Sequence, residues 1–110
     1  MIETSVSNGL PDPPNRIGKT GWSRFPNGDT DCFDVIDEIR HVESDYPGKV
    51  FYLQEIKWRH NQSIDYRLGY YIIGVKPKMK GKWVWGQSCP MMSAVDFKTI
   101  MYEAEKKGWL

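Results

Sequence analysis

Four lysines stand at every second position in the second half of the chain, and two tryptophans follow them directly. The cations are Lys76, Lys78, Lys80 and Lys82, and the rings are Trp83 and Trp85. Side chains two residues apart in an extended backbone point to the same side, so an extended stretch would hold four ammonium groups in one row. Cations beside flat aromatic rings are typical of surfaces that bind phosphates and unstacked bases.

Three further bases lie on the strands predicted before this stretch. They are Lys57, Arg59 and Arg67, and we expect them to extend the positive patch over one face of a sheet. The sequence therefore predicts a small accessory protein that binds nucleic acid, DNA or RNA, through a Lys/Trp hairpin and a basic sheet face. The alternative for the hairpin is a solvated turn whose tryptophans belong to the core, the commoner place for a strand tryptophan.

A possible metal site gives a lesser alternative. Glu55 and Lys57 form a Glu-x-Lys pair on a predicted strand, and Asp45 lies ten residues before Glu55. This pattern resembles the metal-site half of the PD-(D/E)xK nucleases, in which carboxylates hold Mg²⁺ and the lysine assists the attacking water. Asp45 is followed by Tyr-Pro-Gly instead of a strand, so we predict no catalytic residue, no metal and no cofactor, and expect a binding protein more than an enzyme.

The net charge of +1 hides a strong segregation of charge along the chain. Residues 29–45 hold seven acids and one base, whereas residues 46–110 hold eleven bases and five acids. The acidic stretch has apolar residues at three-residue steps (Phe33, Ile36, Ile39 and Val42), which predicts a helix. An acidic helix could dock a basic protein or serve in a small inhibitor, and this interaction module is our second hypothesis for the function.

The elements that would position these groups follow in a simple order. We expect an irregular or partly disordered arm over residues 1–29 and a single compact α+β domain over residues 30–110. Within the domain, a helix after Asp29 or Thr30 precedes three strand-like segments, at residues 49–59, 64–75 and 82–89. A last helix begins after Ser93, a good N-cap residue. The predicted fold is a three-stranded antiparallel sheet flanked by an N-terminal and a C-terminal helix.

This α-β-β-β-α order is similar to that of double-stranded RNA-binding domains. The last helix begins Met92-Ser93-Ala94-Val95-Asp96, without the Lys-Lys-x-Ala-Lys run of that family, so the similarity is one of topology and no residue role follows from it. The chain of 110 residues is 14% aromatic and has no apolar segment long enough for a membrane span. We expect a cytoplasmic protein with no membrane partner; the sequence leaves its oligomeric state open.

Overall fold

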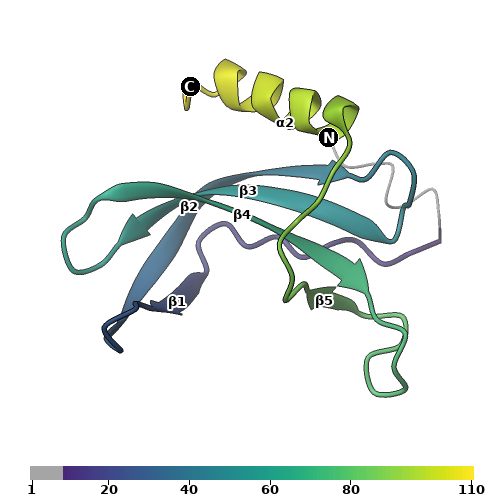
Figure 1. Ribbon diagram of the computed structural model, residues 1–110, viewed down its shortest axis with the longest axis horizontal. Helices are drawn as coiled ribbons and strands as arrows, with labels where there is room; N and C mark the ends of the chain where they lie inside the picture. The colour runs from purple at the N-terminus through teal and green to yellow at the C-terminus, as the bar shows by residue number, and fades with distance from the viewer. Residues whose placement is uncertain (1–8) are drawn as a thin grey trace.

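Five antiparallel strands form one sheet, and a single helix follows them (Figure 1). The computed structural model describes residues 9–110. The strands lie in the sheet in their order along the chain, so each pairs with the next. The elements are β1 (Thr20–Arg24), β2 (Thr30–Val42), β3 (Lys49–Trp58), β4 (Ile64–Ile73), β5 (Trp83–Trp85) and α2 (Ala94–Lys106). Within residues 9–110, no helix has both the length and the apolar character that a bilayer crossing needs.

The prediction of an N-terminal helix was wrong, because residues 30–42 form the long strand β2. Phe33 and Val35 lie on one face of this strand, opposite Trp58 and Ile56 of β3. A β-bulge between Val35 and Asp37 then inserts one residue, after which Ile39 lies on the other face. The bulge changes the spacing of the buried apolar residues from two to four, so that the sequence imitates a helical period.

Within residues 9–110, the predicted three-stranded sheet with two flanking helices is therefore replaced by a five-stranded sheet with one helix. Residues 20–24, which we had placed in an irregular arm, form the edge strand β1. The α-β-β-β-α order shared with double-stranded RNA-binding domains is also absent, because no helix precedes the sheet within residues 9–110. Long-range pairing makes residues 30–42 a strand and not a helix, because β2 pairs with β3 over nearly its whole length.

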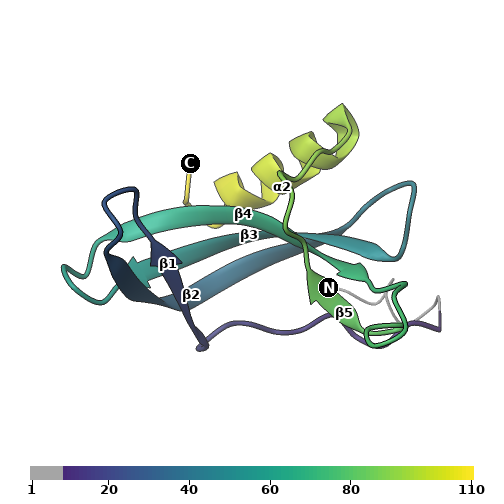
Figure 2. The same cartoon turned by 60° about the horizontal axis from the view of Figure 1, so that its bottom comes forward.

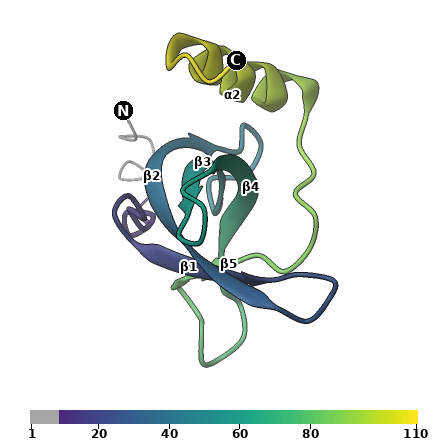
Figure 3. The same ribbon diagram turned by 90° about the vertical axis from the view of Figure 1, so that its left-hand side faces the viewer.

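The sheet curls into a half-barrel, with α2 against its outer face and the edge strands β1 and β5 curving toward each other below (Figure 3). Two glycines are needed in the curled sheet, because a large aromatic ring lies directly on the backbone of each and leaves no room for a side chain. A Cβ at Gly69 would sit 2.2 Å from Cζ2 of Trp85, and one at Gly21 would sit 2.4 Å from Cζ of Phe33. Both rings therefore fill the concave inner face.

The register between β3 and β4 decides which residues share a face. Tyr52 pairs with Gly69, and Gln54 pairs with Arg67. Even-numbered positions of β3 therefore pair with odd-numbered positions of β4, and α2 covers the face of β3 that carries Phe51 and Leu53.

Two apolar clusters result, one on each side of the sheet. The outer cluster joins the sheet to α2 through Ile100 and Ala104, and Trp109 packs against it. The inner cluster consists of Phe33, Val35 and Ile56, with Trp58 packed against it. The predicted C-terminal helix is present, and Ser93 is its N-cap: its side chain accepts a hydrogen bond from the backbone N–H of Asp96.

Candidate functional site on the inner face of the sheet

A chain of polar side chains crosses the inner face over three neighbouring strands. Arg67 of β4 donates from Nη1 to Oε1 of Gln54 at 3.1 Å. Gln54 of β3 donates from Nε2 to Oε1 of Glu38 on β2 at 3.0 Å. The backbone N–H of Arg16 donates to the other oxygen of Glu38 at 3.1 Å, and Nε of Arg40 lies 3.7 Å from that oxygen. Glu38 and Gln54 are both buried, so this series of hydrogen bonds fixes the position of the Arg67 side chain.

The segment before β1 closes part of the inner face. The hydroxyl of Tyr52, which is fully buried, donates to the carbonyl of Pro14 at 2.6 Å. Nε1 of Trp83 donates to the carbonyl of Pro11 at 2.7 Å. Figure 2 shows the segment running beneath the sheet from β5 toward β1. Burial raises the pKa of Tyr52 far above its ordinary value, and the negative charge of Glu38 adds to the shift.

Arg67 is the central cation of the inner face, and no carboxylate in residues 9–110 forms an ion pair with it. Its Cζ lies 4.4 Å from the ring centroid of Trp85 and 5.2 Å from that of Phe33. Desolvation lowers the pKa of Arg67, and the positive charge of Arg16 lowers it further. The guanidinium of Arg16 likewise forms no ion pair within the described residues. Nε and Nη2 of Arg67 donate no hydrogen bond to a described protein atom, so they are available to a ligand.

Two cavities adjoin Arg67, and Trp22 also borders both. The first has a volume of about 340 Å³, and the second has a volume of about 330 Å³. Both are at the small end of the range for ligand sites. The further residues that line the first are Arg16, Thr20, Gly21, Gln54, Tyr71 and Trp85. Those that line the second are Ser23, Phe33, Ile56, Trp58, Asp65 and Tyr66.

The first cavity is a cationic site and the second is an aromatic site. Arg16 and Arg67 both border the first, where an anion would offset two positive charges in a partly desolvated place. Phe33 and Trp58 border the second, where a flat ring would stack on the Trp58 indole; the ring of Tyr66 lies on the outer face against Trp109. The one acid of the second cavity, Asp65, accepts a hydrogen bond from Nε1 of Trp58 at 2.7 Å. Such an arrangement suits a ligand that joins an anionic group to a planar one.

Comparison with known proteins gives no relative from which a role could be carried over. No protein-family model matches the chain. No curated protein and no solved structure gives a significant match either. What the inner face does must therefore be argued from its own geometry.

The structure separates the predicted basic sheet face into two surfaces. Arg67 lies on the inner face, whereas Lys57 lies on the outer face, opposite Asp34 of β2. Arg59 follows β3 and forms an ion pair with Asp34, with Nη2 and Oδ1 2.9 Å apart. The hydrogen bond from Arg59 lowers the pKa of Asp34, and Asp34 in turn raises the pKa of Arg59. The three bases therefore do not form one patch.

The lysines of the β4–β5 connection are all exposed, but they are not held in an extended row. The backbone turns twice: the N–H of Met79 bonds to the carbonyl of Lys76, and the N–H of Lys82 bonds to the carbonyl of Met79. Lys78 and Lys80 lie within these turns, so the two-residue spacing does not align their side chains. Trp83 and Trp85 both lie on the inner face, half-buried, where Trp85 forms a wall of the cationic cavity.

The acidic stretch is not a docking helix in the structure, because β2 takes its place. Most of its carboxylates also have partners within the protein. Asp31 pairs with His60, Asp37 with Lys107, and Glu43 with Lys49. The metal-site alternative gains no support either: Asp45 lies in the β2–β3 turn, and within residues 9–110 no group of three His, Cys, Asp or Glu side chains is placed to hold a metal ion.

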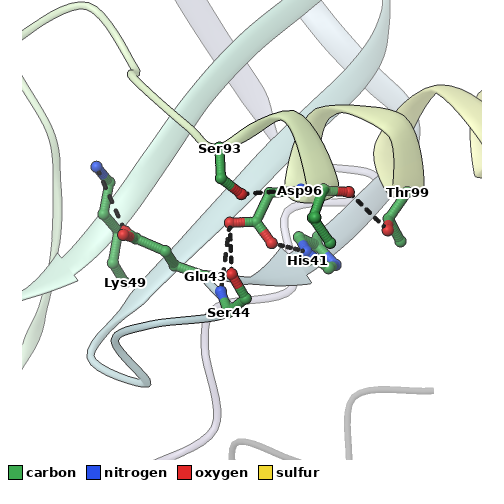
Figure 4. Close-up of polar contacts among 8 residues, drawn as sticks. His41, Glu43, Ser44, Lys49, Ser93, Asp96 and Thr99 are labelled. Atoms are coloured by element: carbon green, nitrogen blue, oxygen red, sulfur yellow. Dashed lines mark hydrogen bonds and ion pairs between the residues drawn. The ribbon is translucent and has the colours of Figure 1, made fainter.

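A second buried polar group joins α2 to the end of β2 (Figure 4). Oδ1 of Asp96 accepts from Nε2 of His41 at 2.7 Å, and Oδ2 accepts from N and Oγ of Ser44 at 3.3 and 3.2 Å. Burial acts to raise the pKa of Asp96, but the hydrogen bonds from His41 and Ser44 outweigh it and lower this pKa. Asp96 is 1% exposed and both its oxygens have partners, so the group anchors the helix.

Sequence reasoning missed most of the inner-face site. It identified Arg67 and Trp85 but not Arg16 or Gln54. Arg16 stands in a Pro-rich segment without periodicity, so no local pattern connects it to Arg67, 51 positions later. Gln54 was the one detectable signal, because it is an uncharged polar residue directly after the apolar run Val50–Leu53.

Proposed function

We propose that this protein binds single-stranded nucleic acid through the inner face of its sheet, with one nucleotide as the recognised unit. The observation that carries the proposal is the pair Arg16 and Arg67, two guanidinium groups on one cavity without an acidic partner in residues 9–110. Guanidinium donors match the oxygens of a phosphate group in geometry and charge. The proposal moves the predicted function from the lysine hairpin to the half-barrel.

The adjoining aromatic cavity would hold the base of the bound nucleotide. A base placed against Trp58 would stack, which contributes about 1–3 kcal/mol per base in single-strand binding. Since the two cavities adjoin at Arg67, a phosphate in the first and a base in the second can belong to one nucleotide. Paired bases in a duplex could not enter the second cavity, so we expect a preference for single strands.

The exposed lysines of the β4–β5 connection extend this site. Lys76, Lys78, Lys80 and Lys82 form no ion pair in the part of the chain that the structure describes. They are suited to contact phosphates on either side of the docked nucleotide. Such contacts add affinity that depends on salt but carry no base information.

Binding of a fluorescein-labelled dT₁₅ strand, measured by anisotropy over a range of salt, tests the proposal. We expect Arg67→Gln and Arg16→Gln each to weaken binding about tenfold, since hydrogen bonds to charged groups contribute about 1.5–3 kcal/mol. Replacing all four loop lysines by Gln should reduce the salt slope by about 0.7 per lost phosphate contact. Arg24→Gln, an exposed arginine on β1, is the matched control and should bind as the wild type does.

Three results would contradict the proposal. One is the absence of binding to any single strand, and another is equal binding by the Arg67→Gln variant. The third is a mononucleotide or an aromatic carboxylate that binds as tightly as dT₁₅, which would make the inner face a small-molecule site. The cytoplasmic location is part of the same proposal, and cell fractionation tests it.

A further inference from the structure

The aromatic cavity has one acid among its lining residues, and this acid is held at the edge of the ring on which a base would stack. Oδ2 of Asp65 accepts from Nε1 of Trp58 at 2.7 Å. Asp65 is exposed, and it takes part in no ion pair within residues 9–110. A carboxylate can accept about four hydrogen bonds, and Trp58 supplies one of them. The remaining acceptor positions are open to a ligand in the cavity.

The register of β4 sets Asp65 beside the cation of the proposed phosphate site. Asp65 pairs with Ile56 of β3 and Arg67 pairs with Gln54, so both lie on the inner face. Arg67 borders both the cationic and the aromatic cavity, whereas Asp65 borders the aromatic one alone of the two. A nucleotide whose phosphate meets Arg67 would therefore have its base in the cavity that Asp65 lines.

A hydroxyl group lies on the β1 side of the same cavity. Ser23 lines the cavity and follows Gly21, which pairs with Phe33 of the inner cluster, so Ser23 also lies on the inner face. The Ser23 side chain forms no hydrogen bond with any residue from 9 to 110. Because a hydroxyl can donate as well as accept, the aromatic cavity offers acceptors from β4 and a donor from β1.

The bases differ in what they present to a carboxylate. Guanine has two adjacent N–H donors, at N1 and N2, with the acceptor O6 beside them. Adenine and cytosine present one amino donor next to a ring nitrogen whose lone pair a carboxylate repels. Thymine and uracil present one N–H between two carbonyl groups. Only guanine can therefore form two parallel charge-assisted hydrogen bonds with one carboxylate, the stronger arrangement.

We infer that the aromatic cavity selects guanine. Asp65 accepts from N1–H and N2–H of the base, the Ser23 hydroxyl donates to O6, and the Trp58 indole stacks on the ring. This inference rests on the proposed function and adds the class of base to it. A bidentate contact to a base edge discriminates by about tenfold or more against a base that cannot form it.

Trinucleotides that compete with fluorescein-labelled dT₁₅ for the wild-type chain test the selection without any variant. We expect d(TGT) to displace the label at a concentration about fivefold or more below that of d(TTT), because one of its three bases can form the bidentate contact. Trinucleotides with adenine or cytosine at the centre should resemble d(TTT). One with hypoxanthine, which is guanine without its 2-amino group, should lose most of the advantage.

Asp65→Asn tests the residue. The amide carbonyl of Asn can still accept from Trp58, but the negative charge is lost and a donor replaces one acceptor. We expect the preference of this variant for d(TGT) over d(TTT) to fall below about twofold. Asp45→Asn is the matched control, because Asp45 is an exposed acid in the β2–β3 turn, and it should keep the full preference.

The outcomes separate this inference from the proposed function. Equal displacement of dT₁₅ by d(TGT) and d(TTT) overturns the selection of guanine and leaves single-strand binding in place. An adenine or hypoxanthine trinucleotide as effective as d(TGT), or a full preference in Asp65→Asn, overturns the role of the Asp65 carboxylate and with it the inference. Absence of any binding to dT₁₅ overturns both proposals.

Discussion

The ring of Trp85 lies over the backbone of Gly69 and, at the same time, 4.4 Å from the guanidinium carbon of Arg67. One indole thus both packs the inner face and holds the cation of the proposed site. A cation above an aromatic face gains about 0.5–2 kcal/mol, depending on how far it is desolvated. The position of the site is therefore tied to the curl of the sheet.

Gly69→Ala should destabilise the protein, because the new methyl group would overlap the Trp85 ring. We expect a loss of about 1–3 kcal/mol in the free energy of unfolding, the usual cost of overpacking. Urea denaturation followed by tryptophan fluorescence measures it. Trp85→Leu is the partner change for a double-mutant cycle: in its background, Gly69→Ala should cost clearly less. Equal costs in both backgrounds would show that the ring does not lie on Gly69.

Tyr52→Phe should loosen the segment before β1. The change removes the hydroxyl that donates to Pro14 and leaves that carbonyl without its partner. We expect a loss of about 1 kcal/mol in stability, together with faster proteolysis of the segment before β1. Tyr102→Phe, on the exposed side of α2, is the matched control. A Tyr52→Phe variant as stable and as resistant as the wild type would contradict the assigned hydrogen bond.

The Asp96 group should make stability depend on pH in the acid range. Its pKa is lower in the folded protein than the ordinary value of 3.8, so the folded state holds fewer protons. The stabilisation is complete above that ordinary value and is lost as the pH falls toward the folded-state pKa. We expect Asp96→Asn to be less stable at pH 7 and to lose less stability on acidification. Denaturation at pH 7 and at pH 3 measures both, and equal losses in the two proteins would argue against the prediction.

Arg59 should matter less for nucleic-acid binding than Arg67, although the sequence analysis placed both in one patch. Arg59 is engaged with Asp34 and Thr20 on the outer face, whereas Arg67 has no acidic partner in residues 9–110. We expect Arg59→Gln to change the affinity for dT₁₅ less than twofold, against about tenfold for Arg67→Gln. Anisotropy at one salt concentration measures both. An equal loss in the two variants would place the strand on the outer face.

The local pattern was sufficient where an element is determined by its own residues. The segment from Lys49 was expected as a strand and forms β3, since its β-branched and aromatic residues favour an extended chain in any register. The helix after Ser93 was expected for a similar reason: the cap, the first-turn acid and the apolar positions Ile100 and Ala104 all lie within fourteen residues. Such signals are read without knowing what the element packs against.

Tertiary structure alone decided the rest. A three-residue spacing from Phe33 to Val42 fits a helix and also fits a strand with one bulge, and only pairing with β3 selects the strand. The pairing of Tyr52 with Gly69 is equally invisible in the sequence, because shifting the register by one residue exchanges the two faces. That register brings Arg67 to the inner face, with Arg16 on the same cavity, and carries Lys57 to the other side. The sequence determined which groups are available, and the strand register determined which of them meet.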